Sequence, residues 1–260
     1  MDALTAPAEL AAPPAWRSID FISDLHLADD TALTYAAWRE YLLHTSADAV
    51  FILGDLFEAW VGDDARHDGF EADAAAVLTE AAVQRPIHFM VGNRDFMLGD
   101  EMLAACGMRA LADPTVLTAF GQRVLLAHGD AWCTGDVEYL RFRSQVRTPA
   151  WRAQALAHPL AQRRALARSM RFESERRAAE HRGEWFDVDD ATALHWMRAS
   201  AASTLVHGHT HRPGTHAITP GFARHVLSDW DLDGATPRAE VLRWRAEGWS
   251  RIGPAQAVQA

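Results

Sequence analysis

The sequence contains no lysine, so all 25 of its basic residues are arginine. Cysteine is scarce as well. Cys106 and Cys133 lie far apart and between different motifs, which argues against a disulfide framework. No run of about 18 apolar residues occurs, which excludes a membrane-spanning helix. Residues 1–15 carry an acid where a signal peptide needs cations, and they lack a continuous apolar segment. We therefore expect a flexible tail over 1–15 and a cytoplasmic protein.

Charge is distributed unevenly along the 260 residues. The net charge is −10, yet 11 of the arginines fall between Arg141 and Arg182, a window with only three acidic residues. Hydrophobic residues make up 49% of the chain and charged residues 23%, which is typical of a soluble globular protein. A basic segment inside an acidic chain indicates that the two regions do different work.

The first two predicted strands both end in groups that can bind a metal. Residues 18–22 read as a buried strand that runs into SDLHL, and residues 49–53 form an apolar run that ends in GDLFEAW. Asp24 and His26 follow the first strand, and their D-x-H spacing puts both side chains on one side of an extended backbone. Asp55 occupies the same place after the second strand. Strands that alternate with helical segments are typical of an α/β protein.

Two later apolar segments end in the same way. A strand over 86–91 leads into GNRD, which contains Asn93, and a hairpin over 115–127 leads into HGD, which begins with His128. The carboxyl ends of strands in an open α/β sheet gather along one crevice. We therefore expect these polar clusters to converge, although they are distant in sequence.

The segment LVHGHTHRP adds three histidines after a fifth strand, which starts at Thr204. His209 and His211 would point the same way, whereas His207 is expected to be structural. A lone HxH pair is more often part of a surface loop than of a metal site, but here four upstream strand ends favour ligands. The expected metal ligands are Asp24, His26, Asp55, Asn93, His128, His209 and His211.

This set combines imidazole, carboxylate and amide groups without a thiolate. Such groups suit Mn, Fe, Zn or Co and argue against a structural zinc site of the cysteine type. Seven ligands exceed the needs of one ion, so two ions that share one carboxylate fit the set. Gly54, Gly92 and Gly208 each precede a ligand, where a missing side chain lets metal or phosphate approach the main chain.

Residues 137–199 break the strand pattern, because they lack β-branched runs and are rich in Ala, Leu, Arg and Glu, as helices are. We expect a core over 16–136 and 200–260 with a helical insertion over 137–199. Apolar residues such as Trp151 and Leu156 would give the insertion an apolar surface, and its arginines could meet phosphates of a substrate or an anionic lipid. A solvated helical face with its own small core is the alternative. Nucleic-acid binding is not expected, because aromatic residues are not regularly interleaved with the arginines.

The order of the motifs resembles that of the calcineurin-like metallophosphoesterases, which carry DxH, GD, GNH, H and GHxH. The resemblance implies a sandwich of two mixed sheets flanked by helices, with a two-metal site that hydrolyses a phosphate ester. One position departs from the pattern, because GNH is GNR here. Arg94 cannot serve as a general acid at ordinary pH, but its guanidinium can neutralise a pyrophosphate in a bidentate fashion. An ion pair of Arg94 with Asp95 or another acid is the structural alternative.

Within that superfamily the chain resembles the UDP-2,3-diacylglucosamine hydrolases, through SDLHL, GDLFEAWVGD, GNRDFMLG, HGDxxCTxDxxYxxFR and HGHTHRP. This resemblance implies that water attacks the α-phosphorus of UDP-2,3-diacylglucosamine and gives UMP and 2,3-diacylglucosamine 1-phosphate (lipid X), in lipid A biosynthesis. It also implies two Mn²⁺ ions per chain and an insertion that acts as a lid over two acyl chains. Peripheral contact with the cytoplasmic face of the inner membrane follows from the lipid substrate, and we expect a monomer.

The same resemblance implies roles for individual residues. The seven expected ligands match the family's metal ligands, with Asp55 in the bridging position. The positions that match catalytic residues are Asp55, Asn93, Arg94 and His209. The positions that match substrate contacts are Asn93, Arg94, Asp136, Ser174 and His209, with Trp60 and Tyr139 as weaker candidates. The family's Asn and Lys contacts are replaced here by Ala178 and His181, and Arg176, Arg177 or Arg182 could supply the cation instead.

Two other functions compete with this interpretation. Another dinuclear metallophosphoesterase, which cleaves nucleotide phosphodiesters or dinucleoside polyphosphates, would be expected to keep GNH and to lack the helical insertion. A scaffold without catalytic activity would be expected to have lost several ligands. Because the chain carries GNR, the insertion and all seven ligands, the sequence favours the lipid-linked pyrophosphate.

Overall fold

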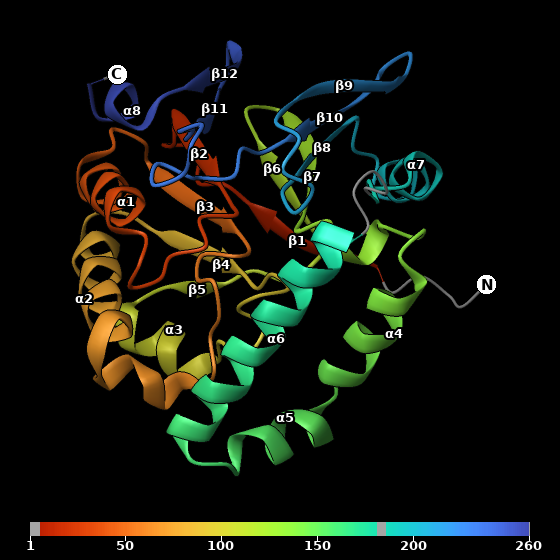
Figure 1. Ribbon diagram of the computed structural model, residues 1–260. Coiled ribbons are helices and arrows are strands. Elements are labelled where there is room, and N and C mark those ends of the chain that lie inside the picture. Colours follow the sequence, from red (N-terminus) through yellow and green to blue (C-terminus); the bar gives the residue numbers. More distant parts are fainter. Residues whose placement is uncertain (1–5, 181–185, 260) are drawn as a thin grey trace.

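Two six-stranded sheets pack face to face in the part of the chain that is described (Figure 1). The computed structural model describes residues 6–180 and 186–259, and of residues 172–180 it describes the backbone alone. The first sheet has the order β12 (Gly248–Ile252), β11 (Val241–Arg245), β2 (Ser18–Ile22), β3 (Ala49–Leu53), β4 (Ile87–Met90) and β5 (Arg109–Ala110). The second has the order β1 (Ala8–Ala11), β6 (Thr115–Ala119), β7 (Gln122–Ala127), β8 (Thr204–His207), β10 (Phe222–Val226) and β9 (Gly214–Thr219). Both sheets mix parallel and antiparallel pairs, which confirms the predicted sandwich of two mixed sheets.

The central strands are rich in apolar residues because they are buried on both faces, and β3 is a continuous apolar run. Every residue of β2 and β3 is buried. Phe21 and Phe51 belong to the core between the sheets, whereas Ile22 and Ile52 pack into the core under the helices. Parallel strands covered on both sides have this composition. Each fully buried side chain of this size contributes about 1.5–3 kcal/mol to folding.

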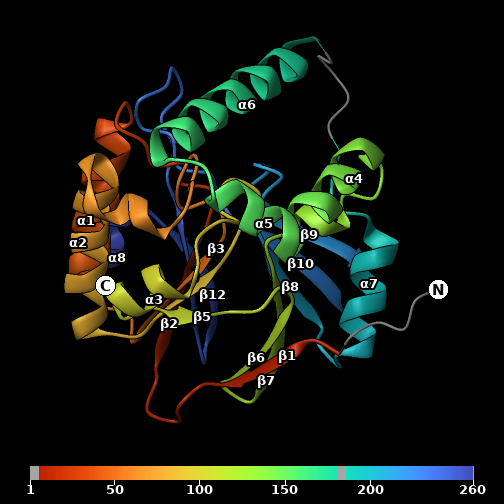
Figure 2. The same ribbon diagram turned by 90° about the horizontal axis from the view of Figure 1, so that it is seen from below.

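Helices cover the outer faces of both sheets (Figure 2). The first sheet is covered by α1 (Ala32–His44), α2 (Gly69–Gln84) and α3 (Asp100–Cys106), and α8 (Pro254–Gln259) lies against α1. The second sheet is covered by α7 (Asp190–Ala199), through Ala193 and Met197. Short 3-10 turns occur at Asp63–His67 and Asp130–Trp132. We expected the insertion to end at residue 199. Because α7 packs onto the sandwich, we count α7 with the core and not with the insertion.

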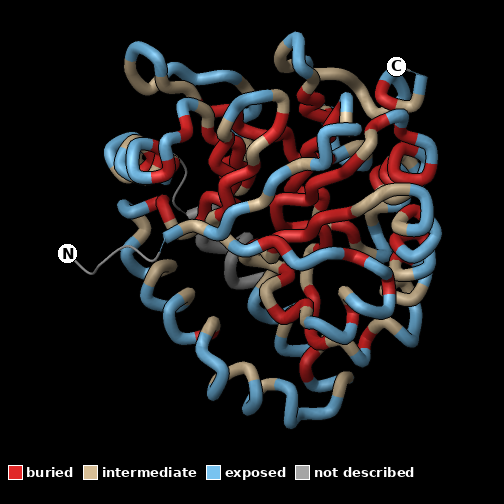
Figure 3. Tube along the Cα trace, turned by 180° about the vertical axis from the view of Figure 1, so that it is seen from behind, coloured by how far each residue is buried: buried red, intermediate tan, exposed pale blue. Residues whose placement is uncertain are grey.

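Three further helices form the remainder of the insertion, which lies along one side of the sandwich (Figures 1 and 2). They are α4 (Val137–Val146), α5 (Pro149–Leu156) and α6 (Leu160–Glu180). The side chains of Asp136 and Thr148 cap α4 and α5, and Pro149 occupies the first turn of α5, where its missing amide is tolerated. Most described residues of these helices are exposed or half-buried, in contrast to the strands (Figure 3).

Arginines tie the insertion to the sandwich. Six of the described ones contact core carboxylates or carbonyl oxygens, namely Arg143 with Asp130, Arg147 with Gly92, Arg152 with Met97, Arg163 with Asp64, Arg164 with Glu71 and Arg171 with Glu58. The most buried of them, Arg163, is 8% exposed. Most of these guanidinium groups therefore have a carboxylate partner in the core, and their contact with phosphates stays a prediction.

The N-terminal segment also differs from expectation. Residues 8–11 form β1, which pairs in parallel with β6, so the predicted tail over 1–15 is wrong for this part. Leu10 and Trp16 pack against the core between the sheets, and this burial explains why the segment is ordered despite its alanine and proline content. Residues 1–5 lie outside the described part of the chain. Among the described helices, none is both long enough and apolar enough to cross a bilayer.

Candidate metal centre

The expected ligands converge where strands of the two sheets end. Asp24 and His26 follow β2, Asp55 follows β3, Asn93 follows β4, His128 follows β7, and His209 and His211 follow β8. Among the described residues, two groups of three side chains present ligand atoms within 4.8 Å of one another. The members of these groups are Asp24, His26 and His211 in one and Asp55, His128 and His209 in the other. The structure thus brings together the residues that the sequence predicts.

The first group is held by two imidazoles that face each other. The Nε2 atoms of His26 and His211 lie 3.2 Å apart, and Nε2 of His211 lies 3.6 Å from Oδ1 of Asp24. The backbone amide of His209 donates hydrogen bonds of 3.0 and 2.9 Å to the two carboxylate oxygens of Asp24, which joins this group to the second one.

The second group is centred on Asn93. Its Oδ1 lies 2.9 Å from Nε2 of His128 and 2.8 Å from Nδ1 of His209. His128 Nε2 also lies 3.7 Å from Oδ2 of Asp55. Asp55 and His128 are buried, whereas His209 is half-buried, so the group opens on one side only. Six side chains in two adjoining groups, with an amide oxygen between two imidazoles, suit a pair of divalent cations.

The imidazole orientations also fit metal binding. Nδ1 of His128 lies 2.8 Å from the carbonyl oxygen of Leu53 and Nδ1 of His211 lies 3.5 Å from Asp229, so each Nε2 is directed into the centre. A metal-binding histidine normally donates its other N–H to a carbonyl or carboxylate, which fixes the tautomer and leaves a lone pair for the ion. His207, by contrast, bonds its own loop through Gly208 and lies outside both groups, as expected of a structural residue.

Backbone strain is concentrated at the expected ligands. Residues with positive φ that are not glycine include Asp24 (55°), His26 (49°), Asp55 (54°), His209 (68°) and His211 (51°). A left-handed conformation costs a residue with a Cβ atom roughly 1–2 kcal/mol. Such strain persists where the surrounding structure enforces it, and it clusters at functional sites.

The glycines of the motifs leave room that a side chain would fill. A Cβ atom on Gly92 would lie 2.0 Å from Oδ1 of Asp55, and one on Gly208 would lie 2.3 Å from Oδ2 of Asp24. Gly54 combines a φ of 93° with a Cβ position 2.4 Å from Nδ1 of His128. We predicted that these glycines let a group come close to the main chain. In the structure, the groups that come close are the side chains of the expected ligands themselves.

The electrostatics of the centre favour positive charge. Burial opposes protonation of His128, but the carboxylates of Asp55, Asp130 and Asp24 outweigh it and raise the pKa of this imidazole to about 9. Burial, together with the charge of His128, lowers the pKa of His209 to about 4. The carboxylates thus hold a proton on one histidine of the group, and a divalent cation would replace that charge.

From the sequence, Asp95 was expected only as a possible ion-pair partner of Arg94. Its buried carboxylate instead accepts hydrogen bonds from the amides of Gly92 (2.7 Å) and Leu56 (2.8 Å). Burial and the nearby charge of Asp55 raise the pKa of Asp95 to about 6. Asp95 therefore joins the loop after β4 to the loop after β3, and its place in GNRD was the only signal in the sequence.

Arg94 has an acidic partner, but a different one. Its backbone amide donates to Oδ1 of Asp55 at 2.8 Å, and its Nη1 lies 3.1 Å from Oε1 of Glu58. Glu58, which the sequence did not single out, also lies 3.1 Å from Nδ1 of His26 through Oε2. A carboxylate three residues after a predicted ligand has no distinctive spacing, so only the fold reveals these contacts.

The predicted substrate contacts fall into different surroundings. Tyr139 donates its hydroxyl hydrogen to Asp130, and its ring lies 6.1 Å from that of His209 at an angle of 29°. Asp136 accepts a 2.9 Å hydrogen bond from the amide of Tyr139 as the cap of α4. Trp60 is 2% exposed and packs in the core under the helices. The side chains of Ser174, Arg176, Arg177, Ala178, His181 and Arg182 lie outside the described part of the chain.

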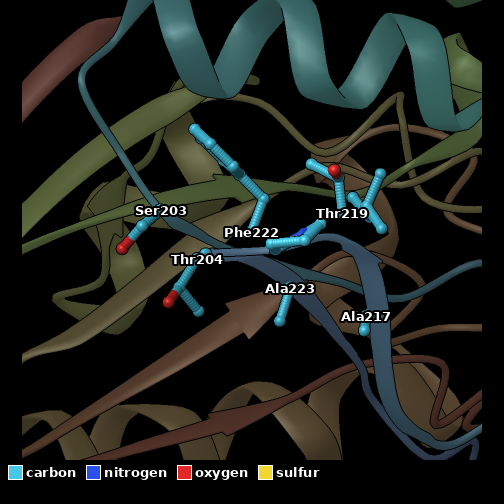
Figure 4. A pocket seen from close by; sticks show the side chains of 9 residues that line it. Ser203, Thr204, Ala217, Thr219, Phe222 and Ala223 are labelled. Atoms are coloured by element: carbon cyan, nitrogen blue, oxygen red, sulfur yellow. The ribbon is translucent and has the colours of Figure 1, made fainter.

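A surface depression of about 520 Å³ lies elsewhere, between β8, β9 and β10 (Figure 4). Ser203, Thr204, Phe222 and Ala223 line it at the amino ends of β8 and β10, which run in parallel. His209 follows the opposite end of β8. The depression is thus remote from the metal centre and takes no part in it.

Several known proteins are similar to this chain. The family model of the calcineurin-like phosphoesterases matches residues 17–213. The chain is 45% identical to the UDP-2,3-diacylglucosamine hydrolase of Chromobacterium violaceum, over 82% of this chain and 90% of the relative. It is 40% identical to the enzyme of the same name from Stenotrophomonas maltophilia, over 89% of this chain and 98% of the relative. Among solved structures, vacuolar protein sorting 29 from Cryptosporidium parvum matches with a TM-score of 0.48 and 12% identity, over 92% of this chain and 98% of that chain.

The sandwich and its metal centre therefore define a calcineurin-like phosphoesterase, a class of hydrolases. Within this class the chain belongs to the family of the UDP-2,3-diacylglucosamine hydrolases, because it matches them at 40–45% identity over nearly their whole length. Both resemblances that the sequence motifs predict are confirmed.

Proposed function

We propose that this protein hydrolyses the pyrophosphate of UDP-2,3-diacylglucosamine, with attack of water at the α-phosphorus. The products would be UMP and 2,3-diacylglucosamine 1-phosphate, an intermediate of lipid A biosynthesis. The observation that carries the proposal is the convergence of seven N and O donors from five strand ends, in a chain whose relatives bear this enzyme name. Such a donor set suits phosphate ester hydrolysis.

We assign two Mn²⁺ ions to the centre. Asp24, His26 and His211 would hold one ion, and Asp55, His128, Asn93 and His209 would hold the other. The match of Asp55 to the family's bridging position supports its being shared by both ions. Bound there, the ions would supply Lewis acidity at the phosphate oxygens and lower the pKa of water in the site toward 7. The hard and borderline donors of this set accept Mn²⁺ without the aid of a thiolate.

The protein's own groups would orient the substrate and hold the leaving group. Arg94 would donate from its guanidinium to the departing sugar phosphate, which leaves as a phosphate and needs no general acid. Asn93 and His209 border the same space and would contact the oxygens of the α-phosphate. Asp136 and Ser174 would contact the substrate, and Trp60 and Tyr139 would belong to the glucosamine or acyl pocket.

We assign the acyl chains to the helical insertion. Exposed apolar side chains gather there and directly after it, namely Val137, Phe142, Leu156, Leu166, Met170 and Phe186. In our proposal these side chains provide the surface that binds the acyl chains. The insertion would then act as a lid and would rest on the cytoplasmic face of the inner membrane while it receives the substrate. A monomer suffices for this arrangement, because all the proposed groups come from one chain.

The decisive experiment is hydrolysis in ¹⁸O-labelled water. Purified protein with Mn²⁺ is mixed with UDP-2,3-diacylglucosamine, and the products are analysed by mass spectrometry. We expect the label in UMP, which places the attack on the α-phosphorus. Label in the sugar phosphate would reverse the proposed direction of attack. Hydrolysis of generic diesters or dinucleoside polyphosphates alone would instead favour another metallophosphoesterase activity.

A further inference from the structure

Glu58 lies at a junction that neither the motifs nor the comparisons assign. It belongs to the segment between β3 and the 3-10 turn at 63–67, and its side chain is 13% exposed. Its two carboxylate oxygens face different partners. Oε2 lies 3.1 Å from Nδ1 of His26, and Oε1 lies 3.1 Å from Nη1 of Arg94.

A third partner comes from the insertion. Nε of Arg171, on α6, lies 3.4 Å from the same Oε1 that faces Arg94. One carboxylate therefore contacts a proposed metal ligand, the arginine proposed to hold the leaving group, and a helix of the insertion. The backbone of Glu58 is fixed as well, because its amide donates to the carbonyl oxygen of Leu27 at 3.1 Å.

The position of Glu58 relative to His26 has counterparts elsewhere in the centre. Leu53 presents a carbonyl oxygen to Nδ1 of His128, and Asp229 presents a carboxylate to Nδ1 of His211. In both cases the acceptor leaves Nε2 for the centre. Glu58 places a carboxylate oxygen 3.1 Å from Nδ1 of His26, as an ion-pair contact, and Nε2 of His26 faces His211 at 3.2 Å. A charged acceptor also makes the imidazole a stronger ligand.

We propose that Glu58 is a positioning residue that orients His26 for the metal and Arg94 for the leaving phosphate, and that Arg171 couples this orientation to the docking of α6. The proposal rests on the proposed function, because it assumes that His26 is a ligand. Glu58 itself touches neither metal nor substrate. Its carboxylate holds two groups at the spacing that the reaction requires, and an error of 1 Å in such spacing can lower a rate by about 100-fold.

A structural role alone would have a different signature. If Glu58 only joined loops, its replacement would lower stability without changing the affinity for metal. The ion pair between Asp64 and Arg163 offers a matched control, because it also joins the sandwich to α6 and its carboxylate accepts from Nη1 at 2.9 Å. Asp64 contacts none of the proposed ligands, and its side chain is 55% exposed.

The test is a titration of the metal-free chain with Mn²⁺, in which the free ion is followed by electron paramagnetic resonance. The variants are Glu58→Gln, which keeps the shape, Glu58→Ala, and Asp64→Asn as the control. We expect both the wild type and Asp64→Asn to bind two ions, and Asp64→Asn to have the same two affinities as the wild type. We expect Glu58→Gln to bind one of the two ions about 10-fold more weakly and Glu58→Ala about 100-fold more weakly. Circular dichroism of each metal-free chain establishes that it is folded.

Unchanged Mn²⁺ affinity in a folded Glu58→Gln chain overturns the proposal, and so does an equal loss in Asp64→Asn. Because this readout needs no substrate, it separates the two proposals. A wild type that binds two Mn²⁺ ions but leaves UDP-2,3-diacylglucosamine intact would contradict the proposed function, while weaker binding by Glu58→Gln would still support the positioning role.

Discussion

Arg147 donates a 2.7 Å hydrogen bond from Nη2 to the carbonyl oxygen of Gly92. Arg147 caps the carboxyl end of α4, whereas Gly92 begins the GNRD loop that carries Asn93 and Arg94. The same guanidinium lies 3.6 Å from the buried carboxylate of Asp130. The insertion is therefore attached directly to the loop that supplies one proposed ligand, and its position bears on the geometry of the centre.

We expect Arg147→Ala to lower kcat for UDP-2,3-diacylglucosamine by about 10-fold or more, because small displacements of reacting groups are costly. Steady-state kinetics of the Mn²⁺-loaded chain provides the measurement. Arg141→Ala, on the exposed side of the same helix, is the control and should retain the wild-type kcat. Equal kinetics in both variants would show that the contact with Gly92 does not position the loop.

We expect Gly92→Ala to abolish the activity, because the added methyl group would overlap Asp55. The new Cβ atom would lie 2.0 Å from Oδ1 of Asp55 and 2.4 Å from its backbone nitrogen, so the two loops must separate. We expect a loss of kcat of at least about 100-fold and a marked loss of Mn²⁺ affinity. Gly253→Ala is the matched control, because the nearest atom to its Cβ would be 3.8 Å away. A Gly92→Ala chain with normal metal affinity would refute this steric argument.

Much of the fold could be predicted because burial leaves a direct trace in the sequence. β2 and β3 are buried on both faces, so β3 follows from an uninterrupted apolar run and β2 from Ile19, Phe21 and Ile22. The hairpin over 115–127 was readable from its two apolar arms around Gly121. β1 left no such trace, since AELA at an exposed edge gains its order from pairing with the distant β6.

The metal centre shows the same division. Asp24, His26 and His209 stand at spacings that their chemistry requires, so their convergence could be predicted from the ends of strands. Glu58 could not be found in this way. Its role depends on Arg94, in the loop that follows β4, and on Arg171, on α6. Both arginines approach Glu58 only when that loop and α6 have folded onto the sandwich. The contact partners of the insertion's arginines could not be predicted for the same reason. Net charge shows an excess of positive charge in a segment but not which groups that charge contacts.

Arg94→Ala tests the proposed role of the guanidinium. We expect kcat for the pyrophosphate substrate to fall about 100-fold, as when one donor is removed from a developing negative charge. An aryl diester with a good leaving group should lose much less. Arg94→Lys should give an intermediate rate, since it keeps the charge but not the planar fork. Equal losses on both substrates would contradict a role at the leaving group.

Asp55→Asn tests the shared carboxylate. An amide oxygen at this position can still accept the hydrogen bond from the amide of Arg94, so the loop should keep its shape. Turnover should nevertheless be abolished, because the shared negative charge is lost. In the wild type, Mn²⁺ at 100 times its Kd should stabilise the chain by about 2.7 kcal/mol for each bound ion, and a chelator should reverse this gain. Asp55→Asn should show a much smaller gain in thermal unfolding, and near-normal activity in this variant would exclude the two-metal proposal.

His88 lies outside the metal centre, and we expect it to make the free energy of unfolding depend on pH. It is 3% exposed and stacks on Phe51 at 4.5 Å. Burial, aided by the charge of Arg109, lowers the pKa of His88 from 6.5 to about 4. The folded chain therefore binds this proton less tightly than the unfolded chain. The contribution to stability is complete above pH 6.5 and is lost as the pH falls from 6.5 toward 4.

His88→Phe removes this titration while it keeps an aromatic ring against Phe51. Between pH 7.5 and pH 5, we expect the wild type to lose about 2 kcal/mol of unfolding free energy relative to the variant. Urea unfolding of both chains at the two pH values, with a chelator present, measures the difference. The other histidines contribute equally to both chains and cancel in this comparison. Parallel stability curves for the two chains would mean that His88 keeps its ordinary pKa in the folded state.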